Sequence, residues 1–405
     1  MIKRTMSNVY DEISNLFPVV LLTGMRQVGK STLLEMLKKD GRKYVSLDNF
    51  EDRELAKTNP ILFIQRYDPP VIIDEVQYAP ELFPAIKVYV DKNRQNGQFW
   101  LTGSQKFSLM QGVQESLAGR IAILELLGFS HYEAENQSDK VIPFLPNAKS
   151  FHSNMSQEMD LKSVYQAIFN GSFPRMLVNK GRGRDIFFKS YIQTYIERDV
   201  KDYHGIVNNL KFYNFIRAVA VRTGNLLNYS DLSRDVDIDM RTAKLWLSIL
   251  ERSGLVRLLY PYYQNLTKRI IKTPKIYFMD TGLCAYLAGM DSPETLEAGY
   301  LTGAILETFA FIQIIMSYSH NGKEPNIYFY RDDDQKEIDF IIEQNATLYP
   351  IEVKKTMTPT LRDAKNFAIL AKLQKPIGDG AVLCLRNSPL PLSDQIIALP
   401  ILDLA

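Results

Sequence analysis

Short apolar runs and amphipathic stretches alternate along the first 130 residues. The amphipathic stretches at 30–39 and 84–95 predict helices, because their apolar residues recur at helical spacing. The apolar runs between them are rich in β-branched and aromatic residues, which is typical of buried inner strands. These runs are PVVLLTG (18–24), YVSLD (44–48), VIIDE (71–75), QFWLTGS (98–104) and IAILELLGF (121–129). Alternation of this kind predicts an α/β fold with a parallel sheet.

The pattern changes after this region. Residues from about 135 to 160 are polar and contain Pro, Asn and Ser, which indicates a linker, and a helical segment follows. From about residue 210 come three helical stretches with a β-rich tail, and then a second α/β segment. We therefore expect an α/β domain, a linker with a helical segment, a helical module and a C-terminal α/β domain, at 1–135, 136–209, 210–265 and 266–405.

Composition narrows the class of protein. The chain of 405 residues is too long for one core, and Lys+Arg (48) nearly balance Asp+Glu (46), so net charge does not demand a nucleic-acid partner. Two distant cysteines and four isolated histidines argue against a disulfide framework and a zinc site. No signal peptide and no apolar run of membrane-spanning length is present, so we expect a cytoplasmic protein without a membrane partner.

Residues 24–31 match the phosphate-loop (Walker A) pattern G-x-x-x-x-G-K-[ST] at every fixed position. The loop follows an apolar strand and precedes a helix, as phosphate binding by backbone N–H groups requires. Lys30 is expected to reach the β- and γ-phosphates of ATP, and Ser31 to ligate Mg²⁺. The expected nucleotide-binding residues are Gly24, Met25, Arg26, Gln27, Val28, Gly29, Lys30, Ser31, Thr32 and Thr102.

Two carboxylates end the run VIIDE, which predicts a Walker B strand. The carboxyl ends of parallel strands line the ligand crevice of open α/β sheets. Asp74 is expected to hold the Mg²⁺ shell, and Glu75 to orient or deprotonate the attacking water. Alone, the pair would equally suit an ordinary acidic strand end; its distance from the phosphate loop favours the functional interpretation.

Further candidates are less specific. Thr102 or Ser104, at the end of another apolar strand, would sense the γ-phosphate or simply form a small-residue turn. Arg120 and Arg198 are candidates for a charge-stabilising arginine in cis or in trans, with a surface ion pair as the alternative for each.

The segments LLTGMRQVGKSTLL, YVSLDN, VIIDEVQYAPELFPAIK, FWLTGSQ, LAGRIAILELLGFS and YIQTYIERDV together resemble a family of prokaryotic AAA-type ATPases. That family carries a C-terminal domain of uncharacterised function. The resemblance extends over nearly the whole chain but is specific only in the ATPase half. It implies an AAA+-like core, a winged-helix middle and a nuclease-like end.

The middle module predicts a helix, a turn, a second helix and a strand, which resembles a winged helix-turn-helix. Ser230 is the candidate N-cap of the first helix and Asp239 of the second. A basic stripe over this region would suit DNA phosphates, whereas a packing module or lid is the alternative. The stripe comprises Arg241, Lys244, Arg252, Lys268, Arg269, Lys272 and Lys275.

The C-terminal segment predicts the order α-β-β-β-α-β, which resembles the PD-(D/E)xK nuclease superfamily. In that resemblance Asp339 is the acid of the second strand, Glu352 and Lys354 form the E-x-K element, and Glu307 is the helix acid. Asp339 and Glu352 would bind a metal ion, and Lys354 would position the attacking water. Ile338 stands where the superfamily has Pro. A solvated strand face and a nuclease-like fold without cleavage activity are the alternatives.

These observations predict an ATP-binding, Mg²⁺-dependent AAA-type ATPase whose cycle controls a nuclease-like domain that acts on DNA. The alternative is an ATP-dependent regulatory switch or assembly module, with an inactive nuclease-like fold used for binding. A third hypothesis is a nuclease with a mainly structural nucleotide site. Homo-oligomers are compatible with each.

Overall fold

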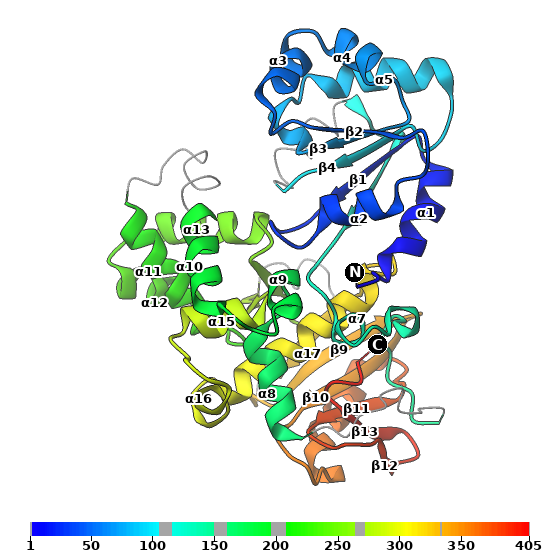
Figure 1. Ribbon diagram of the computed structural model, residues 1–405. Helices are drawn as coiled ribbons and strands as arrows, with labels where there is room; N and C mark the ends of the chain where they lie inside the picture. The colour runs from blue at the N-terminus through cyan, green and yellow to red at the C-terminus, as the bar shows by residue number, and fades with distance from the viewer. Residues whose placement is uncertain are drawn as a thin grey trace. The chain divides into compact units, whose positions relative to one another are not determined.

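The computed structural model describes residues 2–104, 116–149, 160–195, 208–263, 272–332 and 334–404 (Figure 1). The chain divides into two compact units. Unit 1 comprises Met1–Phe129 with the short segments Arg252–Gly254 and Ser319–Gly322. Unit 2 comprises Ser130–Glu251, Leu255–Tyr318 and Lys323–Ala405.

Unit 1 is built on a five-stranded sheet in which every strand pair is parallel, with the strand order β2-β3-β4-β1-β5. All residues of β1, β3 and β4 are buried, because helices cover both faces of the sheet (Figure 1). The strands are β1 (Val19–Thr23), β2 (Lys43–Ser46), β3 (Val71–Asp74), β4 (Phe99–Thr102) and β5 (Ile121–Glu125).

The helices α3 (Phe50–Thr58) and α4 (Pro60–Arg66) begin after asparagine residues whose side chains satisfy free backbone N–H groups. The side chain of Asn49 accepts from the N–H of Asp52, and that of Asn59 accepts from the N–H of Leu62. The helices of unit 1 are α1 (Met6–Leu16), α2 (Lys30–Leu37), α3 (Phe50–Thr58), α4 (Pro60–Arg66), the 3₁₀ turn η1 (Val76–Tyr78) and α5 (Leu82–Asn93).

Unit 2 begins with helices. The first are α7 (His131–Ala134), the 3₁₀ turn η2 (Ser138–Lys140), α8 (Leu161–Asn170), α9 (Pro174–Val178) and α10 (Arg184–Tyr195). Three helices and an antiparallel strand pair follow: α11 (Asn209–Ala220), α12 (Tyr229–Val236), α13 (Met240–Arg252), β6 (Val256–Leu259) and β7 (Lys275–Phe278). The helices α15 (Thr281–Leu287), α16 (Pro293–Ala298) and α17 (Thr302–Ser319) precede the second sheet.

The second sheet is mixed and six-stranded, with the order β12-β13-β11-β10-β9-β8. Its elements are β8 (Ile327–Arg331), β9 (Glu337–Gln344), β10 (Thr347–Val353), the 3₁₀ helix η4 (Leu361–Leu373), β11 (Gly380–Cys384), β12 (Leu390–Ser393) and β13 (Ile396–Pro400). Ile338 and Ile341 of β9 pack with Phe367 and Leu370 of η4 in a buried apolar cluster. Phe311 of α17 stacks on Phe340, which anchors this helix to β9.

α17 is apolar on all sides and almost entirely buried, as a helix enclosed by protein must be. Within the described ranges, no helix combines the length and apolar character needed to cross a bilayer. Cys284 and Cys384 are both free and buried.

The structure confirms the α/β fold class and the amino-terminal parallel sheet. The C-terminal segment begins with the expected order, but its second helix is the 3₁₀ helix η4, and the strands β12 and β13 follow where the expected order ends. Asp239 caps α13 as expected, accepting from the N–H of Thr242 at 2.8 Å. The N-cap expected at Ser230 is wrong. Asn228 caps α12 instead, because its side-chain oxygen accepts from the N–H groups of Ser230 and Asp231. β7 pairs with β6 across the boundary expected at residue 265.

Candidate functional site

The loop from Gly24 to Gly29 joins the carboxyl end of β1 to the start of α2. Gly24, Gln27 and Gly29 have φ values of 141°, 62° and 96°, so the backbone curls rather than extends. A Cβ on Gly24 would lie 2.1 Å from the carbonyl oxygen of Leu126, so only glycine fits there. Such a curled loop ahead of a helix N-terminus turns backbone N–H groups toward an anion.

The side chains of this loop divide by exposure. Those of Met25 and Val28 are buried and anchor the loop, whereas Gln27 and Thr32 are exposed and Arg26 is half-buried. Lys30 is buried, and its Nζ donates to the carbonyl oxygens of Gly24 at 3.0 Å and Met25 at 2.8 Å. The ammonium therefore lies over the loop itself, where it can exchange these carbonyl oxygens for phosphate oxygens.

Asp74, at the carboxyl end of β3, collects hydroxyl groups from three elements. Its Oδ1 accepts from Ser31 at 2.9 Å and also from Thr102, and its Oδ2 accepts from Tyr44 at 2.9 Å. Burial and the Asp74 carboxylate raise the pKa of Tyr44, so this hydroxyl keeps its proton. A carboxylate beside a serine hydroxyl is an oxygen donor set that suits Mg²⁺, so the residues present fit this ion.

Glu75 follows Asp74 in the left-handed region, with φ of 58°. Its N–H donates to the hydroxyl of Thr102 at 3.1 Å, and its carboxylate accepts from the side-chain amide of Gln77. Gln77 also lies 3.5 Å from the hydroxyl of Ser104. Thr102 thus connects the two carboxylate residues, and Ser104 adjoins the amide that holds Glu75.

Arg120 does not lie near the phosphate loop of its own chain. It precedes β5, and its carbonyl accepts from the N–H of Val19, the first residue of β1. The loop follows the other end of β1, about 16 Å away for five residues at ~3.3 Å each. The guanidinium instead forms a two-point ion pair with Asp91, at 2.5 and 3.0 Å. The cis role considered for Arg120 is therefore wrong, while Arg198 lies outside the described residues.

A second set of charged residues gathers in unit 2. The antiparallel register that pairs Ile351 with Phe340 places Glu352 opposite Asp339 one step further on. Directly opposite residues share one face of a sheet, with Cβ atoms about 5 Å apart. Lys354 Nζ lies 2.6 Å from Glu352 Oε1, and Asp339 Oδ2 accepts from the N–H of Val353 at 2.8 Å. Asp339, Glu352 and Lys354 therefore come together.

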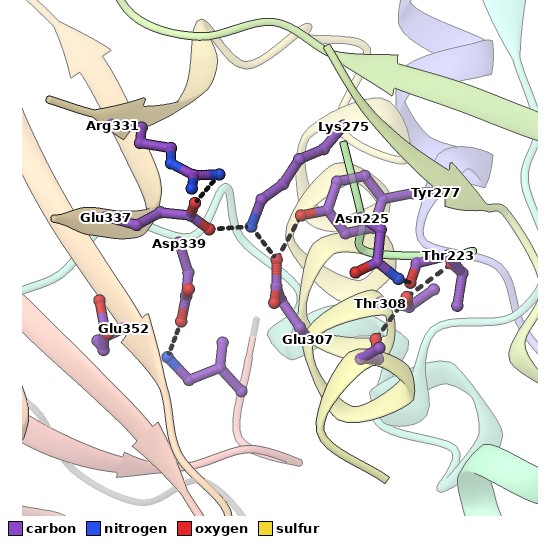
Figure 2. Close-up of polar contacts among 12 residues, drawn as sticks. Thr223, Asn225, Lys275, Tyr277, Glu307, Thr308, Arg331, Glu337, Asp339 and Glu352 are labelled. Atoms are coloured by element: carbon purple, nitrogen blue, oxygen red, sulfur yellow. Dashed lines mark hydrogen bonds and ion pairs between the residues drawn. The ribbon is translucent and has the colours of Figure 1, made fainter. Parts of the chain in front are cut away.

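Glu307 enters this region from α17, and its carboxylate points toward Lys275 and Tyr277 of β7 (Figure 2). Lys275 Nζ lies 2.9 Å from Glu307 Oε1 and 2.5 Å from Glu337 Oε1. The hydroxyl of Tyr277 donates to the same Glu307 oxygen at 2.5 Å. Arg331 adds a looser ion pair with Glu337 at 3.7 Å. We call Lys275, Glu307, Glu337, Asp339, Glu352 and Lys354 the acidic centre.

Burial governs the protonation of the acidic centre. It raises the pKa of Glu352 to about 8 and that of Glu307 to about 7, and the charge of Asp339 contributes to both shifts. Burial also raises the pKa of Asp339, although Lys275 opposes this. For Lys275, burial lowers the pKa but the carboxylates of Glu307 and Glu337 outweigh it, so the pKa is raised and the ammonium persists. Buried acids with raised pKa values are typical of functional sites.

The acidic centre offers two carboxylates to a cation rather than three. Glu352 Oε2 is buried and has no hydrogen-bond partner among the described residues, so this oxygen is available. Asp339 lies opposite Glu352 on the neighbouring strand β9. In the part of the chain that the structure describes, however, no three His, Cys, Asp or Glu side chains are grouped closely enough to hold a metal ion.

Sequence reasoning missed several members of these sites. Tyr44, Gln77, Tyr277 and Glu337 were not singled out, and Lys275 was assigned to a DNA-facing stripe. That assignment is wrong, because its side chain is only 4% exposed and is enclosed by carboxylates. The one signal was a lysine and a tyrosine two positions apart in an otherwise apolar strand. Lys268 and Arg269 lie outside the described residues.

Family models match three consecutive parts of the chain. Residues 16–135 match an AAA domain, residues 161–294 a domain of unknown function (DUF8612) and residues 302–404 a second domain of unknown function (DUF4143). The AAA match includes the phosphate loop, Asp74 and Glu75.

Similar proteins extend over most of the chain. "Uncharacterized protein Rv2008c" of Mycobacterium tuberculosis and "Uncharacterized protein Mb2031c" of Mycobacterium bovis are each 28% identical over 389 residues, which cover 95% of this chain and 80% of theirs. Among solved structures, the Walker-type ATPase PABY2304 of Pyrococcus abyssi is 17% identical with a TM-score of 0.42, covering 71% of this chain and 96% of that one.

Proposed function

We propose that this chain, whose amino-terminal region is an AAA-type P-loop ATPase domain, binds ATP and hydrolyses it with Mg²⁺. The observation that carries the proposal is the Ser31–Asp74 hydrogen bond of 2.9 Å beside the curled loop, with Glu75 next in the chain. This is the arrangement of oxygen donors and acid that phosphoryl transfer to water requires.

In the proposed reaction the loop N–H groups and Lys30 bind the phosphates, and Ser31 and Asp74 hold Mg²⁺. When bound, this ion neutralises charge on the β- and γ-phosphate oxygens. Glu75 accepts a proton from the attacking water. At the same time the water oxygen bonds to the γ-phosphorus, and the bond between the γ-phosphorus and the β–γ bridging oxygen breaks. Gln77, which holds the Glu75 carboxylate, orients it for this step.

Paired substitutions separate binding from chemistry. Lys30→Ala should remove ATP affinity in calorimetry, whereas Glu75→Gln should retain affinity and lose turnover by about 10²-fold or more. The exposed residues Lys38 and Glu81 supply matched controls, because Lys38→Ala and Glu81→Gln leave the loop untouched. Unchanged turnover in both site variants would exclude the proposal.

A second activity is supported by the buried, unpartnered oxygen of Glu352 opposite Asp339. We propose that these two carboxylates hold one divalent cation and that Lys354 positions a water for cleavage of a nucleic-acid phosphodiester. The element order of a winged helix is found in the preceding helices α11, α12 and α13 and the β6–β7 pair. In this proposal the winged helix binds the nucleic acid that is cleaved. ATP hydrolysis would then control this activity. Nicking of plasmid DNA with Mn²⁺ tests the proposal, and equal nicking by Asp339→Asn would exclude it.

A further inference from the structure

Lys275 belongs to the strand pair of the middle module, not to the sheet that carries the acidic centre. β7 pairs antiparallel with β6, in a register that sets Lys275 against Leu259, and Lys275 also bridges to Leu226. Alternate residues of a strand share a face, so Lys275 and Tyr277 point the same way. The ring of Tyr277 stacks on Phe311 of α17 at 4.3 Å, which fixes β7 against the helix that carries Glu307.

The two side chains of β7 occupy one oxygen of Glu307. Lys275 Nζ and the Tyr277 hydroxyl lie 2.9 and 2.5 Å from Glu307 Oε1, and the ammonium also reaches Glu337 at 2.5 Å (Figure 2). With only 4% of its side chain exposed, Lys275 is held in place by carboxylates on two sides. Its position between acids from α17 and β9 is the kind of position that a bound metal cation takes.

A divalent ion that used Glu307 as a ligand would have to approach this ammonium. Like charges repel strongly where water does not screen them, so the two cations compete for the carboxylate. Glu352 differs, because its second oxygen is free of hydrogen bonds in the described part of the molecule. Lys354, the other ammonium of the centre, binds the opposite oxygen of Glu352 and is partly exposed.

We infer that Lys275 is a built-in cation of the acidic centre, which withholds Glu307 from metal coordination and leaves Asp339 and Glu352 as the ligands of a single divalent ion. The inference rests on the proposed cation site for its second half. Its first half, the exclusion of metal from Glu307 by Lys275, stands on the contacts of β7 alone.

Mn²⁺ binding to the full-length, nucleotide-free protein tests the inference, with Ser31→Ala as background to remove the phosphate-loop ligand. Bound Mn²⁺ is followed by electron paramagnetic resonance. Asp339→Asn should weaken binding at least tenfold, whereas Glu307→Gln should leave it within twofold. Lys275→Met should tighten binding at least tenfold, and adding Glu307→Gln should abolish that gain. Lys272→Met, a change at an exposed lysine three residues earlier, should have no effect.

The outcomes separate the inference from the cation site itself. A tenfold loss of Mn²⁺ affinity in Glu307→Gln would overturn the inference, because Glu307 would then be a ligand. If the background protein binds no Mn²⁺ that depends on Asp339, the cation site fails, and Lys275→Met alone decides the role of the lysine. A new Mn²⁺ site in Lys275→Met that depends on Glu307 would still support the role of the lysine. If Lys275→Met melts cooperatively but gains no such site, that role is refuted. If Lys275→Met does not fold, a loss of Mn²⁺ affinity in Glu307→Gln would refute it.

Discussion

At Gly24 a hydrogen atom in place of a side chain lets the phosphate loop lie directly under the carbonyl of Leu126. Two separate costs would follow from any substitution. The backbone has a φ of 141°, which L-residues rarely adopt, and a Cβ would lie 2.1 Å from that carbonyl oxygen. Gly41 has only the first of these costs, because its φ is 86° and nothing lies within 4 Å of the position a Cβ would take.

We therefore expect Gly24→Ala to lower the free energy of unfolding by about 3 kcal/mol, the sum of backbone strain and overpacking. Gly41→Ala should cost only about 1 kcal/mol. Urea denaturation of both variants checks the difference. Equal losses would mean that the loop relaxes freely around the new methyl group.

His131, at the start of α7, predicts a dependence of stability on pH. Burial lowers its pKa to about 4, below the value of 6.5 expected in the unfolded chain. The unfolded chain therefore binds more protons between these values, so stability is complete above about pH 6.5 and is lost as pH falls toward 4. The shift corresponds to at most about 3 kcal/mol. Thermal melts between pH 7 and 4.5 should show a steeper loss of stability with falling pH in the wild type than in His131→Gln; parallel curves would contradict the prediction.

Among the elements of unit 2, β7 links the middle module to the acidic centre, whereas α13 presents basic side chains to solvent. Arg241 and Lys244 of α13 are exposed, whereas Ala243, Trp246 and Leu247 are buried. A helix with a buried apolar face and exposed basic residues can contact phosphates without disturbing the core.

Charge reversal of Arg241→Glu with Lys244→Glu should weaken binding to duplex DNA at least tenfold if this helix contacts phosphates. The salt dependence should also flatten, since each lost phosphate contact removes about 0.9 from the slope of log K against log salt. Fluorescence anisotropy over a salt series measures both quantities. Reversal of the exposed Lys162 and Lys189 on α8 and α10 provides the comparison, and equal effects there would indicate general attraction rather than a specific face.

How much the sequence predicts differs between these elements. The phosphate loop and the pair Asp74–Glu75 are written in consecutive residues, so spacing and the preceding strand are sufficient to predict them. The roles of Lys275 and Tyr277 depend on packing against residues more than 25 positions away, and a basic residue in a strand has no local feature that reveals burial. Helix caps are intermediate: Asn228 and Ser230 both suit the position, and only the backbone geometry selects Asn228.

In the proposed function, one chain combines an ATP cycle with a reaction on nucleic acid. Glu75→Gln should hold the protein in its ATP-bound form, and Lys30→Ala should hold it in the nucleotide-free form. If the cycle controls cleavage, the two variants should differ at least fivefold in Mn²⁺-dependent plasmid nicking at saturating ATP. Identical nicking rates with and without ATP, in both variants, would mean that the two activities are independent. The control is the nicking rate of the wild type, which must be measurable and must be abolished by Asp339→Asn.

Because β7 contributes Lys275 to the acidic centre, it also affects where the chain can be cut into stable fragments. The segment 302–404 matches one family model by itself, yet the ammonium that balances Glu307 and Glu337 comes from residue 275. An excised fragment that starts at residue 302 would leave Glu307 without the ammonium of Lys275 and would leave Glu337 with only the looser pair to Arg331, so we expect it to be less stable than a fragment that keeps β7. A fragment that starts upstream of β6 keeps Lys275, and we expect it to be the more stable of the two.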